Sequence, residues 1–310
     1  MKKTKLIILF LSIATTLLLF FFKENRNASI AKKLKTISQD EYQCLDYFFR
    51  SELNCLGYSL FGNKPIAVMG YHEPLTEINS VDKMLNRIFC TFHPENLKMY
   101  RGWELWKKHH HLFPMKNYAI IKSKNFFDNN YAAILFINKK EFKKTVQNNI
   151  RDFKEILGNE VTPESLLNEV LKSKDIFGDV LKHHQGLIGT LLGFGRHNAW
   201  LFHQREELSF LSGEIRPLLG APFSLMKQPP NSLFQKELDA LNQTLQPFDD
   251  REVLDLNPLF LSLPDFVADP NTAETKRLKA DYEQQYRQII HHYQKGNFLE
   301  TTLQKMTSEN

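Results

Sequence analysis

The chain has 310 residues, of which 42% are hydrophobic and 24% charged, and this balance excludes a disordered chain and predicts one or two globular domains. Its net charge of +5 is concentrated at the N-terminus, where residues 1–35 hold eight Lys or Arg and one acid, Glu24. Residues 1–35 therefore carry +7 and residues 36–310 carry −2. Because a near-neutral body lacks the wide cationic face that binds phosphate backbones, we expect no nucleic-acid partner. Three cysteines also exclude a disulfide scaffold and multi-cysteine zinc modules.

A membrane-spanning helix is predicted near the N-terminus. Leu6 to Phe22 is a run of 17 uncharged residues behind a lysine-rich leader. As a helix, such a run rises about 25 Å, enough to cross a bilayer. A core helix would show a polar stripe, which this run lacks. The nearest small-x-small cleavage triplet begins only at Ser29, so we expect an uncleaved single-pass anchor.

Two signals disagree on the orientation of this anchor. A short positive leader before a hydrophobic run is typical of a signal, which leaves the body outside the cytoplasm. However, five Lys or Arg between residues 23 and 35 outnumber the three lysines before the run, and the positive-inside rule then favours a cytoplasmic body. We predict a membrane protein with an extracytoplasmic body, and a cytoplasmic body is the alternative.

The first half of the body is predicted to mix helices and strands. A capping box at Ser38 to Glu41 opens a helix that continues to Gly57. A second helix follows the last predicted strand and is stopped by Gly158. Turn residues separate four β-prone runs, which predict two short strand pairs. The two pairs are Tyr58–Phe61 with Ile66–Met69, and Tyr118–Ile121 with Tyr131–Ile137.

After Gly158 every strong hydrophobic period is close to 3.6 residues, which predicts helices. Thr162-Pro163-Glu164 begins one helix, Ser232 another, and residues 271–274 cap a long helix that should pack on the body. The predicted fold class is therefore α+β and predominantly helical. Its two short β pairs lie within 58–137, and its C-terminal half is all helical. Residues 1–35 form the anchor and basic flank, and 36–310 one globular body, with a boundary near 158 as the alternative.

A glycine-rich segment follows His183 and His184, with glycines at 186, 189, 193 and 195. A dinucleotide-binding loop needs Gly-x-Gly-x-x-Gly directly after a strand, and this segment has neither the spacing nor the strand. We therefore predict a helix that packs closely through Gly186 and Gly189 and ends at Gly193 to Gly195.

Polar residues just beyond these glycines form the candidate site. Arg196 and His197 should open a new helix, on which His203 and Glu207 are i,i+4 neighbours. A carboxylate one turn away can orient an imidazole as a base, and Arg196 could hold an anionic group. His197 lies about 240° around the helix from His203, so the two cannot share a metal. The hypothesis is hydrolysis or transfer with His203 or His197 as base, Glu207 orienting it and Arg196 binding substrate. The structural alternative is a buried polar network or a solvated helix face.

The remaining histidines and the cysteines give no metal or cofactor site. Histidines at 109–111 and 291–292 are consecutive, and consecutive helical side chains diverge by about 100°. Cys44 and Cys55 are too far apart along one helix to form a disulfide, whereas a pairing of Cys90 with either one stays open. We therefore expect no cofactor and no metal.

Three stretches, Gly57 to Pro65, Leu192 to Phe202 and Phe266 to Asn271, occur in an order that resembles membrane-anchored proteins of Chlamydia-like intracellular bacteria, a family without an assigned activity. The resemblance covers most of residues 40–290. It implies a bacterial envelope setting and no catalytic residue.

The preferred interpretation is a membrane-tethered envelope protein whose body is a binding or structural module with a protein partner. The chain has 25 Phe, 10 Tyr and 3 Trp, enough for a core and for an exposed apolar contact patch, which this interpretation predicts. The alternative is the hydrolase or transferase around residues 196–207.

Overall fold

The structure is a computed structural model that describes residues 29–51, 53–72, 94–124, 131–212, 232–248, 261–294 and 296–308. The described part is predominantly helical with a small antiparallel sheet, which confirms the α+β prediction. Among the helices described, none is both long and apolar enough to cross a membrane. The predicted anchor, Leu6 to Phe22, lies outside the described residues.

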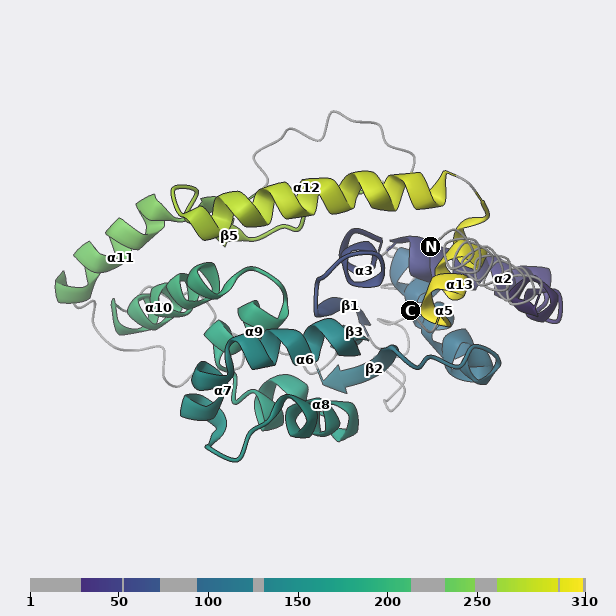
Figure 1. Cartoon of the computed structure of the whole chain (residues 1–310), viewed down its shortest axis with the longest axis horizontal. Helices are drawn as coiled ribbons and strands as arrows, with labels where there is room; N and C mark the ends of the chain where they lie inside the picture. Colours follow the sequence, from purple (N-terminus) through teal and green to yellow (C-terminus); the bar gives the residue numbers. More distant parts are fainter. Residues whose placement is uncertain are drawn as a thin grey trace, which may run out of the picture.

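A three-stranded antiparallel sheet occupies the centre of the molecule (Figure 1). Strand β3 (Tyr131–Asn138) lies between β1 (Ile66–His72) and β2 (Tyr118–Lys124). Leu135 of β3 pairs with Val68 on one side and with Ile121 on the other. The predicted pairing of Tyr118–Ile121 with Tyr131–Ile137 is thus confirmed. The predicted strand Ile66–Met69 is part of β1, which pairs with the other edge of β3.

The sheet separates two hydrophobic clusters, because β3 is buried on both faces. Ala132, Ile134 and Phe136 belong to the first cluster, and the alternating residues at 133, 135 and 137 belong to the second. The first face is covered by α2 (Gln39–Ser51), α3 (Leu53–Leu60), α5 (Pro94–His109), α12 (Ala273–Tyr293) and α13 (Phe298–Met306). The second is covered by α6 (Lys139–Asn148), α7 (Ile150–Leu157), α8 (Pro163–Lys172), η2 (Ile176–Val180) and α9 (Gln185–Leu191).

The predicted strand at Tyr58–Phe61 is wrong, because most of this run is the end of helix α3. Gly57 does not stop the helix. It lies inside α3 where this helix packs on α12, and a Cβ there would lie 3.4 Å from the side chain of Ile289. The single helix predicted up to Gly57 is instead two helices, α2 and α3. Its predicted start is confirmed, since the Glu41 N–H donates to Ser38 Oγ at 3.4 Å.

The predicted helix up to Gly158 is also divided in two. Asn149 separates α6 from α7, and its side-chain amide donates to the carbonyl of Thr145 at 2.9 Å. The stop at Gly158 is confirmed, since this residue caps α7 with a φ of 119°. The next start is confirmed too, because Thr162 caps α8 with Pro163 in its first turn. Helices on both sides of Gly158 contribute to the second cluster.

The C-terminal half is not all helical as predicted. Between α11 (Ser232–Thr244) and α12, the two-residue strands β4 (Gln246–Pro247) and β5 (Val267–Ala268) pair antiparallel. Next to this pair, the Phe248 N–H donates to the Phe266 carbonyl at 2.8 Å, and the rings of the two residues stack with centroids 4.2 Å apart. A pair so short leaves no periodic signal in the sequence. The capped long helix is confirmed as α12, with Thr272 as its cap, and it runs along the molecule over α3 (Figure 1).

Candidate functional site

The glycine-rich segment joins α9 to α10 (Arg196–Ser212) by a tight turn. Gly186 and Gly189 face α10, and the turn is possible because Gly193 and Gly195 adopt φ values of 80° and 84°. The predicted short helix, its close packing and its end are confirmed. With α9 and α10 joined in this way, α10 has two separate sides of interest, one that lines a pocket and one that carries a polar stripe.

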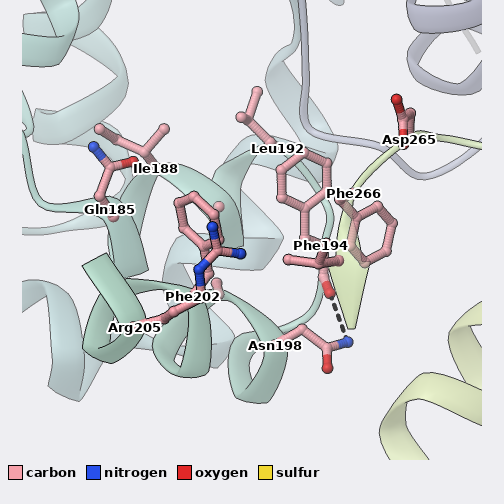
Figure 2. A pocket seen from close by; sticks show the side chains of 12 residues that line it. Gln185, Ile188, Leu192, Phe194, Asn198, Phe202, Arg205, Asp265 and Phe266 are labelled. Carbon is pink, nitrogen blue, oxygen red and sulfur yellow. Dashed lines mark hydrogen bonds between the residues drawn. The ribbon is translucent and has the colours of Figure 1, made fainter. Parts of the chain in front are cut away.

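On one side, α9, α10 and the segment entering β5 enclose a pocket of about 410 Å³. Figure 2 shows the rings of Phe194 and Phe266 side by side at one wall and Phe202 of α10 at another. The first two rings are stacked, with centroids 4.4 Å apart. Ile188 and Leu192 complete the apolar surface. We call this cavity the aromatic pocket.

The polar residues of the aromatic pocket already have partners within the protein. Asn198 is buried and fully engaged: its amide donates to the Phe194 carbonyl, and its oxygen accepts from the Asp269 N–H. It fixes the wall and does not await a ligand. The Arg205 guanidinium lies 5.3 Å from the Phe202 ring centre and forms an ion pair with Glu206 at 3.5 Å, in which both side chains are largely buried. Arg205 is the cation among the residues that line the pocket.

The opposite side of α10 carries a polar stripe. Arg196, Trp200, His203 and Glu207 are spaced by four, three and four residues, which places them on one helical face. His203 Nε2 lies 3.4 Å from Glu207 Oε1, as the i,i+4 spacing predicted. The structure adds His184, which precedes α9 and whose ring centre is 4.1 Å from that of His203. Burial, followed by the nearby His203, lowers the pKa of His184.

The structure therefore places three of the four predicted site residues on one face of α10, where His203 and Glu207 are in contact, and it separates the fourth. His197 faces away, its ring Nε2 4.0 Å from Asp269 and its backbone N–H bonded to Glu274. The residues that line the aromatic pocket include none of the four. His184 was not predicted, although a His just before a helix start is a recognisable capping position.

Arg196 is already engaged. It forms a two-pronged ion pair with Asp152 of α7, at 2.5 and 2.9 Å, and the hydrogen bonds from this pair raise its pKa. Its guanidinium also lines a second, polar pocket of about 350 Å³ between α6 and α12. That pocket mixes cations such as Arg277 with acids such as Glu274 and Asp281, so it has no clear charge preference.

A buried lysine connects the three stretches quoted from the sequence. Lys64 of the first stretch is 5% exposed, and its ammonium lies 5.8 Å from the ring centre of Phe194, in the second. Phe194 in turn stacks on Phe266, in the third. Burial lowers the pKa of Lys64. Nothing in the sequence around Lys64 marks it as buried.

The described part also bears on the metal site, the disulfide and the exposed apolar patch that were considered from the sequence. No group of three or more His, Cys, Asp or Glu side chains in these residues is arranged to hold a metal ion. Cys44 and Cys55 do not form a disulfide, and Cys90 lies outside the described residues. Leu211, at 40%, is the large apolar side chain that is exposed in this part of the chain, so the predicted apolar patch is not found there.

No protein-family model, curated protein or solved structure matches this chain. The site is therefore interpreted from its own geometry.

Proposed function

We propose that this chain is a membrane-tethered envelope protein whose body is a binding module, and that its ligand is a planar apolar group bearing a negative charge. The observation that carries the proposal is the aromatic pocket. Its volume of about 410 Å³ lies in the range of ligand-binding cavities. The tether rests on the apolar run from Leu6 to Phe22, and the envelope setting on the resemblance of the three stretches.

The shape and charge of the pocket support this ligand class. Flat rings on two walls favour a planar partner, because aromatic groups gain from offset stacking as well as from burial. Arg205 supplies the positive charge at the wall beside Phe202, and an anionic ligand would share its guanidinium with Glu206, which lies 3.5 Å away. The acid of the pocket, Asp265, is exposed at its margin, where solvent screens it. The ligand could be a free small molecule or the same chemistry presented by a partner protein.

Binding of naphthalenesulfonate to the full-length chain in phosphatidylcholine nanodiscs tests the proposal, with empty nanodiscs as the blank. Fluorescence anisotropy should show saturable binding that Phe202→Ala weakens roughly tenfold, since burial of a ring contributes over 1 kcal/mol. Leu211→Ala, on the same helix but outside the pocket, is the matched control and should leave the affinity unchanged.

The charge preference has its own test. Arg205→Gln should weaken naphthalenesulfonate but not the cationic naphthyltrimethylammonium, because only the anion gains from the guanidinium. If both probes bind the wild type equally, the proposed charge preference is wrong. If neither Phe202→Ala nor Arg205→Gln changes binding, the pocket is not the binding site.

A second function, hydrolysis or transfer, is favoured by the contact between His203 and Glu207. In this proposal His203 is the base and Glu207 orients it. The substrate-binding role predicted for Arg196 would require the substrate to compete with Asp152, which already holds its guanidinium. His197 is the natural control because it is separated from the stripe. Turnover of nitrophenyl acetate or nitrophenyl phosphate that is lost in His203→Ala and kept in His197→Ala would support it, whereas equal turnover in both would reject it.

A further inference from the structure

We propose that His184 and His203 make the aromatic pocket sensitive to acid, so that protonation loosens α9 and releases the ligand. This inference rests on the proposed binding function for its biological meaning. Its structural part, the loosening of α9, can be tested without any ligand.

The first step is the cap of α9. His184 Nδ1 accepts the backbone N–H of Leu187 at 3.3 Å and so satisfies one of the unpaired donors at the helix start. An imidazole accepts a hydrogen bond only through a nitrogen that carries no proton, and imidazolium has none. Protonation of His184 therefore removes this cap from a helix of seven residues.

The second step is the repulsion between His184 and the neighbouring His203. The rings of His184 and His203 are 4.1 Å apart at an angle of 37°, and both contact Trp200. Two imidazolium ions at this distance repel each other, so acidification favours separation of α9 from α10.

The charges around the pair do not remove this effect. From α10, Glu207 would stabilise a cation, but its side chain is 63% exposed and therefore screened. The charge of Asp152, on α7, is neutralised by its ion pair with Arg196, which belongs to the same stripe as His203. Lys182 and His183, on the segment of His184 itself, are exposed cations or potential cations.

The third step is stored backbone strain. Lys182 and His183 have φ values of 51° and 55°, in the left-handed region that non-glycine residues rarely adopt, and they follow the π-helical turn η2. Such conformations persist only where surrounding contacts hold them. The contacts of His184 are among those that hold this segment, so their loss lets it relax.

These steps reach the pocket because α9 is one of its walls. Gln185, Ile188 and Gly189 all line it, within five residues of His184. A loosened α9 start would therefore move the wall that faces Phe202 and lower the affinity for ligand.

Hydrogen exchange of the full-length chain in nanodiscs, followed by mass spectrometry, tests the loosening at about pH 7.5 and about pH 4.5; the lower value is set well below the ordinary histidine pKa because burial lowers the pKa of His184. After correction for intrinsic exchange rates, protection of α9 should fall roughly fivefold at the lower pH, as expected for loss of a cap, while α8 is unchanged. His184→Asn keeps a strong cap that does not titrate and should abolish the change. His197→Asn, which removes an exposed histidine of α10, should not.

Naphthalenesulfonate, whose charge is constant over this range, links the loosening to the pocket. Its affinity should fall by a similar factor at the lower pH in wild type and in His197→Asn, but not in His184→Asn. Equal α9 protection at both pH values, or a change that persists in His184→Asn, would overturn the inference. Absence of probe binding at both pH values, with the α9 change present, would instead reject the proposed binding function.

Discussion

A Cβ atom on Gly189 of α9 would lie 2.8 Å from the Cβ of Ala199 on α10, closer than two carbon atoms can pack. The two helices therefore meet at a point where only a hydrogen fits. Gly189→Val should force them apart and destabilise the fold by about 1–3 kcal/mol, the usual cost of overpacking. Chemical denaturation measures this cost, and Gln204→Ala, at an exposed position of α10, should cost less than about 0.5 kcal/mol.

The ion pair of Arg196 with Asp152 gives a second prediction. The Asp152 side chain is only 9% exposed, whereas Arg196 is half exposed, so removal of the arginine leaves a nearly buried carboxylate without its donors. Arg196→Ala should lower the free energy of unfolding by about 1–3 kcal/mol. Arg196→Lys restores the charge but not the planar guanidinium, so its free energy of unfolding should lie between those of the wild type and Arg196→Ala. A loss as large in Arg196→Lys as in Arg196→Ala would show that geometry, not charge, dominates.

Local rules predicted much of the fold, because caps and breaks depend on neighbouring residues. The starts at Ser38, Thr162 and Thr272 and the stop at Gly158 were all correct. Gly57 was misjudged because a glycine that ends a helix and a glycine inside a helix look alike in sequence. Its neighbour Ile289 lies more than 200 residues away along the chain, so no local pattern shows the packing of α3 on α12.

In the candidate site, too, contacts between residues close in sequence were predicted and contacts between distant residues were not. The i,i+4 spacing predicted the contact of His203 with Glu207, and helical rotation predicted that His197 would face elsewhere. The sequence could not show that Asp152 forms an ion pair with Arg196, since 44 residues separate them. For the same reason the aromatic pocket, which joins α10 to Phe266, was not foreseen.

Glu41 gives a prediction that depends on pH. The Lys108 ammonium donates to its carboxylate at 2.6 Å, and chiefly through this bond the pKa of Glu41 falls from 4.5 to about 2. Because the folded state holds the ionised form, the stabilisation is complete above 4.5 and is lost as the pH falls toward about 2. Glu41→Gln, which keeps a capping side chain without the charge, should lower the urea midpoint at neutral pH.

The difference between wild type and Glu41→Gln should then shrink as the pH falls through this window. Lys108→Met provides the matched control, because it removes the same bond from the other side. A pH dependence of the midpoint difference that survives in the Lys108→Met background would assign the effect to another partner of Glu41, such as His109, whose Nε2 lies 3.4 Å from Glu41 Oε2.

Lys64 is predicted to destabilise the fold. Lys64 is buried, this burial lowers the pKa of its ammonium, and the ring of Phe194, whose centre lies 5.8 Å away, offsets part of the cost. An uncompensated polar group costs about 1–3 kcal/mol in proteins, and Lys64→Met, which fills a similar volume, should raise the free energy of unfolding by a similar amount. Chemical denaturation at neutral pH measures this gain. Lys305→Met is the comparison, since that lysine is half-buried and has a lowered pKa as well.

The sign of the pH dependence separates a buried charge from a simple packing change. The folded pKa of Lys64 lies below its ordinary value of 10.5, so between the two values the unfolded chain binds more protons than the folded chain. Stability of the wild type should therefore rise with pH across that interval, and the advantage of Lys64→Met should shrink as the pH approaches 10.5. A gain that is equal at neutral and alkaline pH would mean that methionine merely packs better. A loss of stability at neutral pH would mean that the ammonium has a partner that offsets its burial.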